Sequence, residues 1–187
     1  MANLTIADYL KYANLQMAAE ALYNFNATRP NANLVPGAIT TGNIDPTDPQ
    51  VLTDGNLHAS KFTLTEAKKF AEQWTVVEHK SNTTTGFSGT LFRALKDDPT
   101  QNIRQGDLVL SFRSTEFLDD AARDNQATNT LEIAGKGWAF GQLSDMEQWY
   151  QSLKSSGQIT GPLTVTAYSL GGQLATAFNL MHQSEVQ

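Results

Sequence analysis

The sequence predicts an α/β fold in which a mixed sheet is flanked by helices. Two β-rich segments, 86–95 and 106–114, are joined by a short turn-forming link, so they predict an antiparallel hairpin. A helical pattern, a β-branched run at 163–168 and a second helical pattern then alternate, which is typical of a sheet that turns parallel. The length of 187 residues suits a single domain spanning residues 1–187.

The N-terminal third predicts one helix and a long loop-rich segment. Thr5 and Asp8 form a capping-box pattern at the start of a helix expected over residues 6–23. Its apolar residues recur at helical spacing: Ile6, Tyr9, Leu10, Ala13, Met17 and Ala21. Segment 26–60 is rich in Asn, Pro, Gly, Thr and Asp, which predicts a long loop or several turns.

The remaining segments complete the expected order of elements. Thr63 or Thr65 caps a short helix that ends near residue 74, and a strand follows over 75–81. After the hairpin, the polar stretch 115–137 predicts a loop. An amphipathic helix is expected from residue 138 to 156. The β-branched strand and a helix over 170–183 end the pattern.

Composition excludes several classes of function. The net charge of −6 and pI of about 4.9 argue against a nucleic-acid partner, which calls for a basic patch. The chain has no cysteine, so disulfides, thiolate nucleophiles and zinc–thiolate sites are excluded. No run of about 20 apolar residues predicts a transmembrane segment. The N-terminus does not follow the signal-peptide pattern, so we expect a cytoplasmic protein or one secreted by another route.

The stretch TVTAYSLGGQLATAF, residues 164–178, predicts a strand, a sharp turn and a helix, with Ser169 at the turn. This context suits the G-x-S-x-G turn of serine hydrolases, in which the nucleophile stands between strand and helix. Here the first position is Ala167 and the second is Gly171, so the motif departs from the pattern at one small residue. Ser169 is therefore the candidate nucleophile. The N–H of Leu170 would open the helix and be an oxyanion donor.

The same stretch has two alternative interpretations. Ser169 could be the N-cap of the last helix, without a chemical role. A phosphate-binding loop would need a G-K-[ST] ending, and SLGGQLAT lacks it.

Four segments together resemble the class 3 lipase family, in the family's order over roughly residues 60–180. GDLVLSFRSTEF resembles its V-x-F-R-G-T segment, NTTTGFSGTLFRAL its preceding strand, GKGWAFGQL the start of its next helix, and TVTAYSLGGQLA its elbow. The resemblance, to bacterial members above all, implies an α/β-hydrolase fold with a mixed, mostly parallel sheet. It also implies a serine hydrolase of carboxylic esters, a lipase, esterase or phospholipase acting in lipid metabolism.

Carried over residue by residue, the resemblance assigns Thr115 as the second oxyanion-hole donor beside Leu170. Ser114 stands where the family has Gly. Residues 116–136 would form a lid that contacts a lipid interface. Arg113 would tether this lid through an acidic residue, with an exposed salt bridge as the alternative. The acidic residues proposed for the tether are Glu116, Asp119 and Asp120.

The general base is the missing part of this prediction. The family order places the acid and the His after Ser169, and the only later histidine is His182. It lies 13 residues on, along the same expected helix, so we expect it on the helix surface about 20 Å away. His58 and His79 precede Ser169, against the family order.

We therefore expect the acid and the His beyond residue 187, in a longer protein, and negligible esterase activity from these 187 residues alone. The alternative function is a non-catalytic interaction module on a hydrolase scaffold. The chemistry needs no cofactor and no metal. Calcium at Asp45, Asp48 and Asp54 is a further alternative, although these residues do not follow the spacing of a calcium loop.

Overall fold

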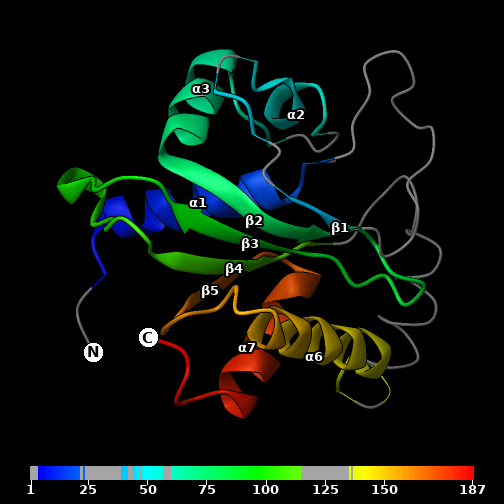
Figure 1. Cartoon of the computed structure of the whole chain (residues 1–187). Helices are drawn as coiled ribbons and strands as arrows, with labels where there is room; N and C mark the ends of the chain where they lie inside the picture. Colours follow the sequence, from blue (N-terminus) through cyan, green and yellow to red (C-terminus); the bar gives the residue numbers. More distant parts are fainter. Residues whose placement is uncertain are drawn as a thin grey trace.

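The computed structural model describes residues 4–21, 23, 39–41, 44–46, 48–56, 60–114, 135 and 137–187. In this part of the chain the elements form three layers (Figure 1), with a twisted sheet between two layers of helices. Helices α1, α2 and α3 lie on one side of the sheet, and α6 and α7 lie on the other. The prediction of an α/β fold with a mixed sheet flanked by helices is confirmed.

The sheet has five strands in the described residues, in the order β1-β2-β3-β4-β5. They are β1 (Ile39–Thr40), β2 (Trp74–Lys80), β3 (Gly89–Ala94), β4 (Leu108–Phe112) and β5 (Thr164–Ala167). The first three neighbouring pairs are antiparallel, and only β4 and β5 pair in parallel. The prediction of a mostly parallel sheet is therefore wrong for this part of the chain.

Connection length explains this strand arrangement. The link of residues 81–88 between β2 and β3 is too short for a parallel crossover, and the link of residues 95–107 between β3 and β4 folds back on itself at an antiparallel bridge between Asp98 and Ile103. The connection from β4 to β5 contains α6, and a crossover of that length is what a parallel pair requires. The predicted hairpin of β3 and β4 is confirmed. The predicted loop over 26–60 contains β1 and the short helix α2 (Gln50–Thr53).

Helices α1, α3 and α7 begin where the sequence predicts, and α6 begins two residues later than predicted. Helix α1 (Ile6–Ala19) has a complete capping box at Thr5 and Asp8, and α3 (Leu64–Gln73) has one at Thr63 and Glu66. A one-turn 3-10 helix, η1 (Pro99–Gln101), lies in the β3–β4 link. Helices α6 (Phe140–Ser155) and α7 (Leu170–Met181) follow β4 and β5.

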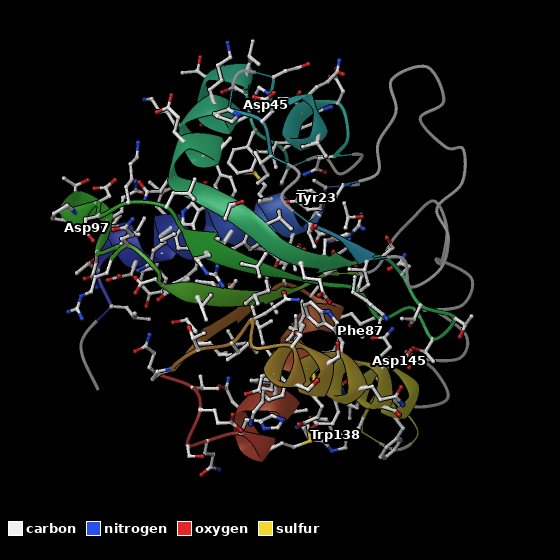
Figure 2. The ribbon with its side chains drawn as sticks, in the orientation of Figure 1. Tyr23, Asp45, Phe87, Asp97, Trp138 and Asp145 are labelled. Atoms are coloured by element: carbon white, nitrogen blue, oxygen red, sulfur yellow. The ribbon has the colours of Figure 1, made fainter. Side chains whose placement is uncertain are left out.

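Alternate residues of the central strands enter two separate cores. Phe92 and Val109 pack with α1 and α3, whereas Leu91 and Leu110 pack with α6 and α7. Figure 2 shows Tyr23 on the α1 side of the sheet and Phe87 on the α6 side. Because β4 is covered on both faces, all five of its residues are buried. No helix in the described ranges is long and apolar enough to cross a membrane.

The first half of helix α1 buries polar side chains and exposes much of the apolar stripe of the helix, whereas Leu15, Ala18 and Ala19 of its second half pack in the core. Ile6 is 87% exposed and Tyr9 63%, whereas Asp8 and Lys11 are buried. The buried pair binds the link that follows η1: Lys11 Nζ donates to the carbonyl oxygen of Asn102 at 2.9 Å, and Asn102 Nδ2 donates to Asp8 Oδ1 at 3.2 Å. These bonds compensate for burying two charged groups.

Candidate active site

Ser169 lies at the turn between β5 and α7, in a backbone conformation that is rare for a residue with a side chain. Its φ is 52° and its ψ is −123°. Such a conformation typically costs about 1–3 kcal/mol and persists where the surrounding structure enforces it. Tyr168 and Ser169 are both exposed, so the turn presents the serine at the surface. A sharp strand-to-helix turn with an exposed serine is the arrangement that the G-x-S-x-G motif describes.

The hydroxyl of Ser169 does not cap helix α7. Ser169 occupies the N-cap position, but its side chain makes no capping hydrogen bond. In contrast, Thr5 and Thr63 are both in the extended conformation usual for N-caps, and each accepts a backbone N–H. Helix capping therefore does not explain the serine at position 169.

Gly171 explains the second small residue of the motif. A Cβ built on it would lie 2.5 Å from the carbonyl oxygen of Phe112 and 2.6 Å from that of Arg113. The start of α7 is thus in direct contact with the end of β4. A Cβ on Gly172 would meet nothing within 4 Å. Ala167, at the first motif position, is a half-buried residue of β5 that pairs with Phe112, so a methyl group is accommodated there.

Of the two expected oxyanion donors, the structure describes one. Leu170 is the first residue of α7, so its N–H has no acceptor within the helix and lies at the positive end of the helix dipole. The first turn of the helix is closed by Gly172 N, which donates to the carbonyl oxygen of Ser169 at 2.9 Å. Thr115 and the predicted lid over 116–136, apart from Gly135, lie outside the described residues.

Arg113 is buried, so its interpretation as an exposed salt bridge is wrong. Its Nε lies 3.4 Å from Glu20 Oε2, and its Nη2 donates to the carbonyl oxygen of Glu20 at 2.8 Å. Both side chains are about 95% buried. The described partner of Arg113 is therefore the C-terminal end of α1. The predicted lid partners Glu116, Asp119 and Asp120 lie outside the described residues.

His79 is engaged in the interior of the protein. It is 2% exposed, its Nδ1 lies 2.8 Å from Thr90 Oγ1, and its ring packs on Tyr23 with centroids 4.8 Å apart. Burial, with a smaller contribution from the charge of Arg113, lowers the pKa of His79 to about 3. At neutral pH a group with this pKa is a poor general base. His79 is on β2, whereas Ser169 follows β5. Because β3 and β4 lie between β2 and β5, the axes of β2 and β5 are about 14 Å apart.

His182 is not the surface residue that the sequence predicted. It is the C-cap of α7, and its exposed fraction is only 9%. Its Nε2 lies 2.8 Å from Glu147 Oε2 and its Nδ1 3.3 Å from Glu185 Oε1. Both ring nitrogens are thus occupied at the far end of the helix from Ser169, about 20 Å away along the helix axis. His58 lies outside the described residues.

The calcium alternative finds no support in the part of the chain described. Among those residues, no three His, Asp or Glu side chains come together as metal ligands. Asp54 instead accepts a hydrogen bond from Gln50 within α2, and Asp45 and Asp48 lie in the irregular segment before that helix.

Sequence reasoning missed two residues that hold the elements of this site. Glu20 binds Arg113 and accepts a hydrogen bond from the backbone N–H of Ser114 at 3.0 Å. Gln173, one turn after the candidate nucleophile, donates to the carbonyl oxygen of Gly137 at 2.7 Å and accepts from the N–H of Ala139 at 3.2 Å. No local motif signals either role, because their partners are 34 to 94 residues away in the chain.

Comparisons of the chain with protein-family models, with curated proteins and with solved structures find no match. The fold shown is an α/β fold with a five-stranded mixed sheet. Its assignment to the α/β-hydrolases, and the role of Ser169, stay predictions from the sequence.

Proposed function

We propose that this protein is a serine hydrolase that cleaves carboxylic esters through an acyl-enzyme at Ser169, on a scaffold of the α/β-hydrolase type. The observation that carries the proposal is the backbone of Ser169, with φ 52° and ψ −123°, in a serine that makes no capping hydrogen bond. Residues with a strained backbone cluster at functional sites, where the strained conformation is part of the mechanism. Helix capping, the alternative reason for a serine here, does not apply.

In the proposed reaction, Ser169 Oγ attacks the carbonyl carbon of the ester while its proton passes to a general base. The carbonyl oxygen becomes an oxyanion, for which the Leu170 N–H is a donor, and the sequence assigns Thr115 as the second. When the tetrahedral intermediate collapses, the alcohol leaves with the proton, and water then hydrolyses the acyl-enzyme. The base and its acid are proposed to lie outside the described residues, since both described histidines are engaged elsewhere.

An acyl group of lipid type is the substrate class we propose. Tyr168, adjacent to Ser169, is 66% exposed and offers an aromatic surface beside the nucleophile. The resemblance to class 3 lipases favours the same class. Triacylglycerols, phospholipids and small soluble esters all share this chemistry, and a series of p-nitrophenyl esters of increasing acyl length distinguishes long-chain from short-chain preference.

The proposal is tested by treating the full product of the coding sequence with a fluorophosphonate and locating the adduct by mass spectrometry. We expect one adduct per chain, at Ser169, and none in Ser169→Ala or in heat-unfolded protein, because only an activated serine reacts. If the folded full product carries no adduct, the alternative of a non-catalytic interaction module is favoured. An adduct on another serine would also contradict the proposal.

A further inference from the structure

A buried polar cluster lies between α1 and the sheet, directly behind the end of β4. His79, Thr90 and Ser111 are cross-strand neighbours in one row over β2, β3 and β4, and all three are buried. Ser111 Oγ donates to Gln16 Oε1 at 2.9 Å, which connects this row to α1. Polar groups in this position replace the apolar residues that cover the rest of this face.

Glu20, the C-cap of α1, connects this cluster to the end of β4. Its Oε1 accepts from Gln16 Nε2 at 2.6 Å and from the backbone N–H of Ser114 at 3.0 Å. Its Oε2 lies 3.4 Å from Arg113 Nε, and its own carbonyl oxygen accepts from Arg113 Nη2. One buried glutamate thus binds two consecutive residues of the segment that leaves the sheet.

The same segment is in contact with the elbow from the other side. The carbonyl oxygens of Phe112 and Arg113 face Gly171, at the distances that leave no room for a Cβ. Residues 112–114 are therefore held between α1 and α7. A shift of this segment therefore moves the backbone that Gly171 contacts, two residues after Ser169. It also moves Ser114, the residue before Thr115.

We propose that Glu20 is a positioning residue for the candidate active site. It fixes the end of β4 relative to the elbow, and so sets the geometry of Ser169 and of the Leu170 N–H. This role deepens the proposed hydrolase function and rests on it. A carboxyl group suits the task because its two oxygens accept from Gln16 and from the N–H of Ser114 while it also lies beside Arg113. A displacement of about 1 Å at a reacting centre can cost about 10²-fold in rate.

The variants Glu20→Ala, Glu20→Gln and Glu20→Asp separate position from charge. Glutamine keeps an oxygen that accepts from Ser114 and Gln16 but loses the ion pair with Arg113. Aspartate keeps the charge, but its side chain is one methylene group shorter, so both oxygens lie farther from Ser114 and Arg113. Glu78→Ala is the matched control, because Glu78 is equally buried and accepts from Trp149 and Gln158, on a strand remote from the elbow.

Two measurements are made on the full product of the coding sequence. The first is hydrogen exchange of the peptides that contain Ser114 and Ser169, which does not depend on catalysis. We expect exchange at least about tenfold faster in Glu20→Ala and Glu20→Asp, and near wild type in Glu20→Gln and Glu78→Ala. The second is the rate of fluorophosphonate labelling, corrected for the folded fraction. We expect a loss of about 10–100-fold in Glu20→Ala and Glu20→Asp, and less than about threefold in Glu20→Gln and Glu78→Ala.

The outcomes distinguish the two proposals. Unchanged exchange at Ser114 in Glu20→Ala, or labelling at the wild-type rate, overturns the positioning role of Glu20. If Glu20→Ala does not fold, Glu20→Asp decides in the same way. If the wild-type protein is not labelled at all, the proposed hydrolase function fails, and the exchange measurement alone decides whether Glu20 holds the end of β4.

Discussion

Gly171 lies so close to Phe112 that a Cβ at position 171 would stand 2.5 Å from the Phe112 carbonyl oxygen. The obstacle is backbone, which cannot move aside as a flexible side chain does. We therefore expect Gly171→Ala to lower the free energy of unfolding by about 1–3 kcal/mol, the usual cost of overpacking. Urea denaturation monitored by circular dichroism measures this change.

The next residue provides the control for that prediction. A Cβ on Gly172 would meet no atom within 4 Å, and this residue lies in the first turn of α7. Gly172→Ala should raise the free energy of unfolding by up to about 1 kcal/mol, because alanine favours the helix. Equal destabilisation by the two substitutions would contradict the contact between α7 and the end of β4.

Because the backbone of Ser169 is strained, we expect glycine at this position to give a larger free energy of unfolding than alanine. Ser169→Gly removes the Cβ that makes φ 52° unfavourable, whereas Ser169→Ala keeps it. We expect the glycine variant to exceed the alanine variant in free energy of unfolding by about 1 kcal/mol. Chemical denaturation of the two variants side by side gives this difference directly. An alanine variant at least as stable as the glycine variant would show that the turn carries no strain.

The buried His79 predicts a loss of stability in acid. Its pKa is lowered to about 3, chiefly by burial, whereas a histidine in the unfolded chain has a pKa of about 6.5. Between these values the unfolded chain binds a proton that the folded protein does not, so the free energy of unfolding falls as the pH decreases from about 6.5 to 3. The slope from this one group is at most about 1.4 kcal/mol per pH unit.

His79→Asn tests this prediction, because the asparagine amide can still bond Thr90 at the position of Nδ1. We expect the variant to lose the slope due to His79 while the slopes due to carboxylates remain in both proteins. Denaturation curves at pH 7, 6, 5 and 4 measure the two slopes. Parallel pH dependence in wild type and variant would mean that His79 is protonated as easily in the folded protein as in the unfolded chain.

The sequence predicted those features of the fold that depend on local patterns. The capping box of Thr5 and the cap candidates Thr63 and Thr65 marked two helix starts, and the β-branched run before Ser169 marked β5. The β3–β4 hairpin followed from a short link with turn residues. Strand direction in the rest of the sheet did not follow from local patterns, because it depends on which neighbours pair.

The support of the candidate site could not be predicted, because it is built from long-range contacts. Arg113 was recognised from the segment around it, but its buried partner Glu20 lies 93 residues earlier in the chain. The sequence placed His182 on the last helix, yet its burial depends on Glu147, Tyr150 and Glu185, which lie outside that helix. Hydrophobic periodicity carries no information on such pairs.

The apolar spacing that predicted helix α1 does not mark its buried face, because most of that stripe is exposed to solvent. Tyr9 and Leu10 belong to the apolar stripe but are 63% and 55% exposed, whereas Lys11 and Leu15 are buried. We expect Tyr9→Gln and Leu10→Gln to change the free energy of unfolding by no more than about 0.5 kcal/mol, as exposed substitutions do. Leu15→Ala should cost about 2–5 kcal/mol, because it leaves a cavity against the sheet.

A reciprocal pair of substitutions makes this prediction sharper. Lys11→Leu removes the cation beside Asp8 and the bond to the carbonyl oxygen of Asn102, so we expect it to lower the free energy of unfolding. Leu10→Lys places a charge in solvent and should cost almost nothing. If α1 instead buried its apolar stripe, the order would be reversed, with Leu10→Lys the more damaging of the two. Guanidinium denaturation of these two variants therefore decides which face of α1 lies against the sheet.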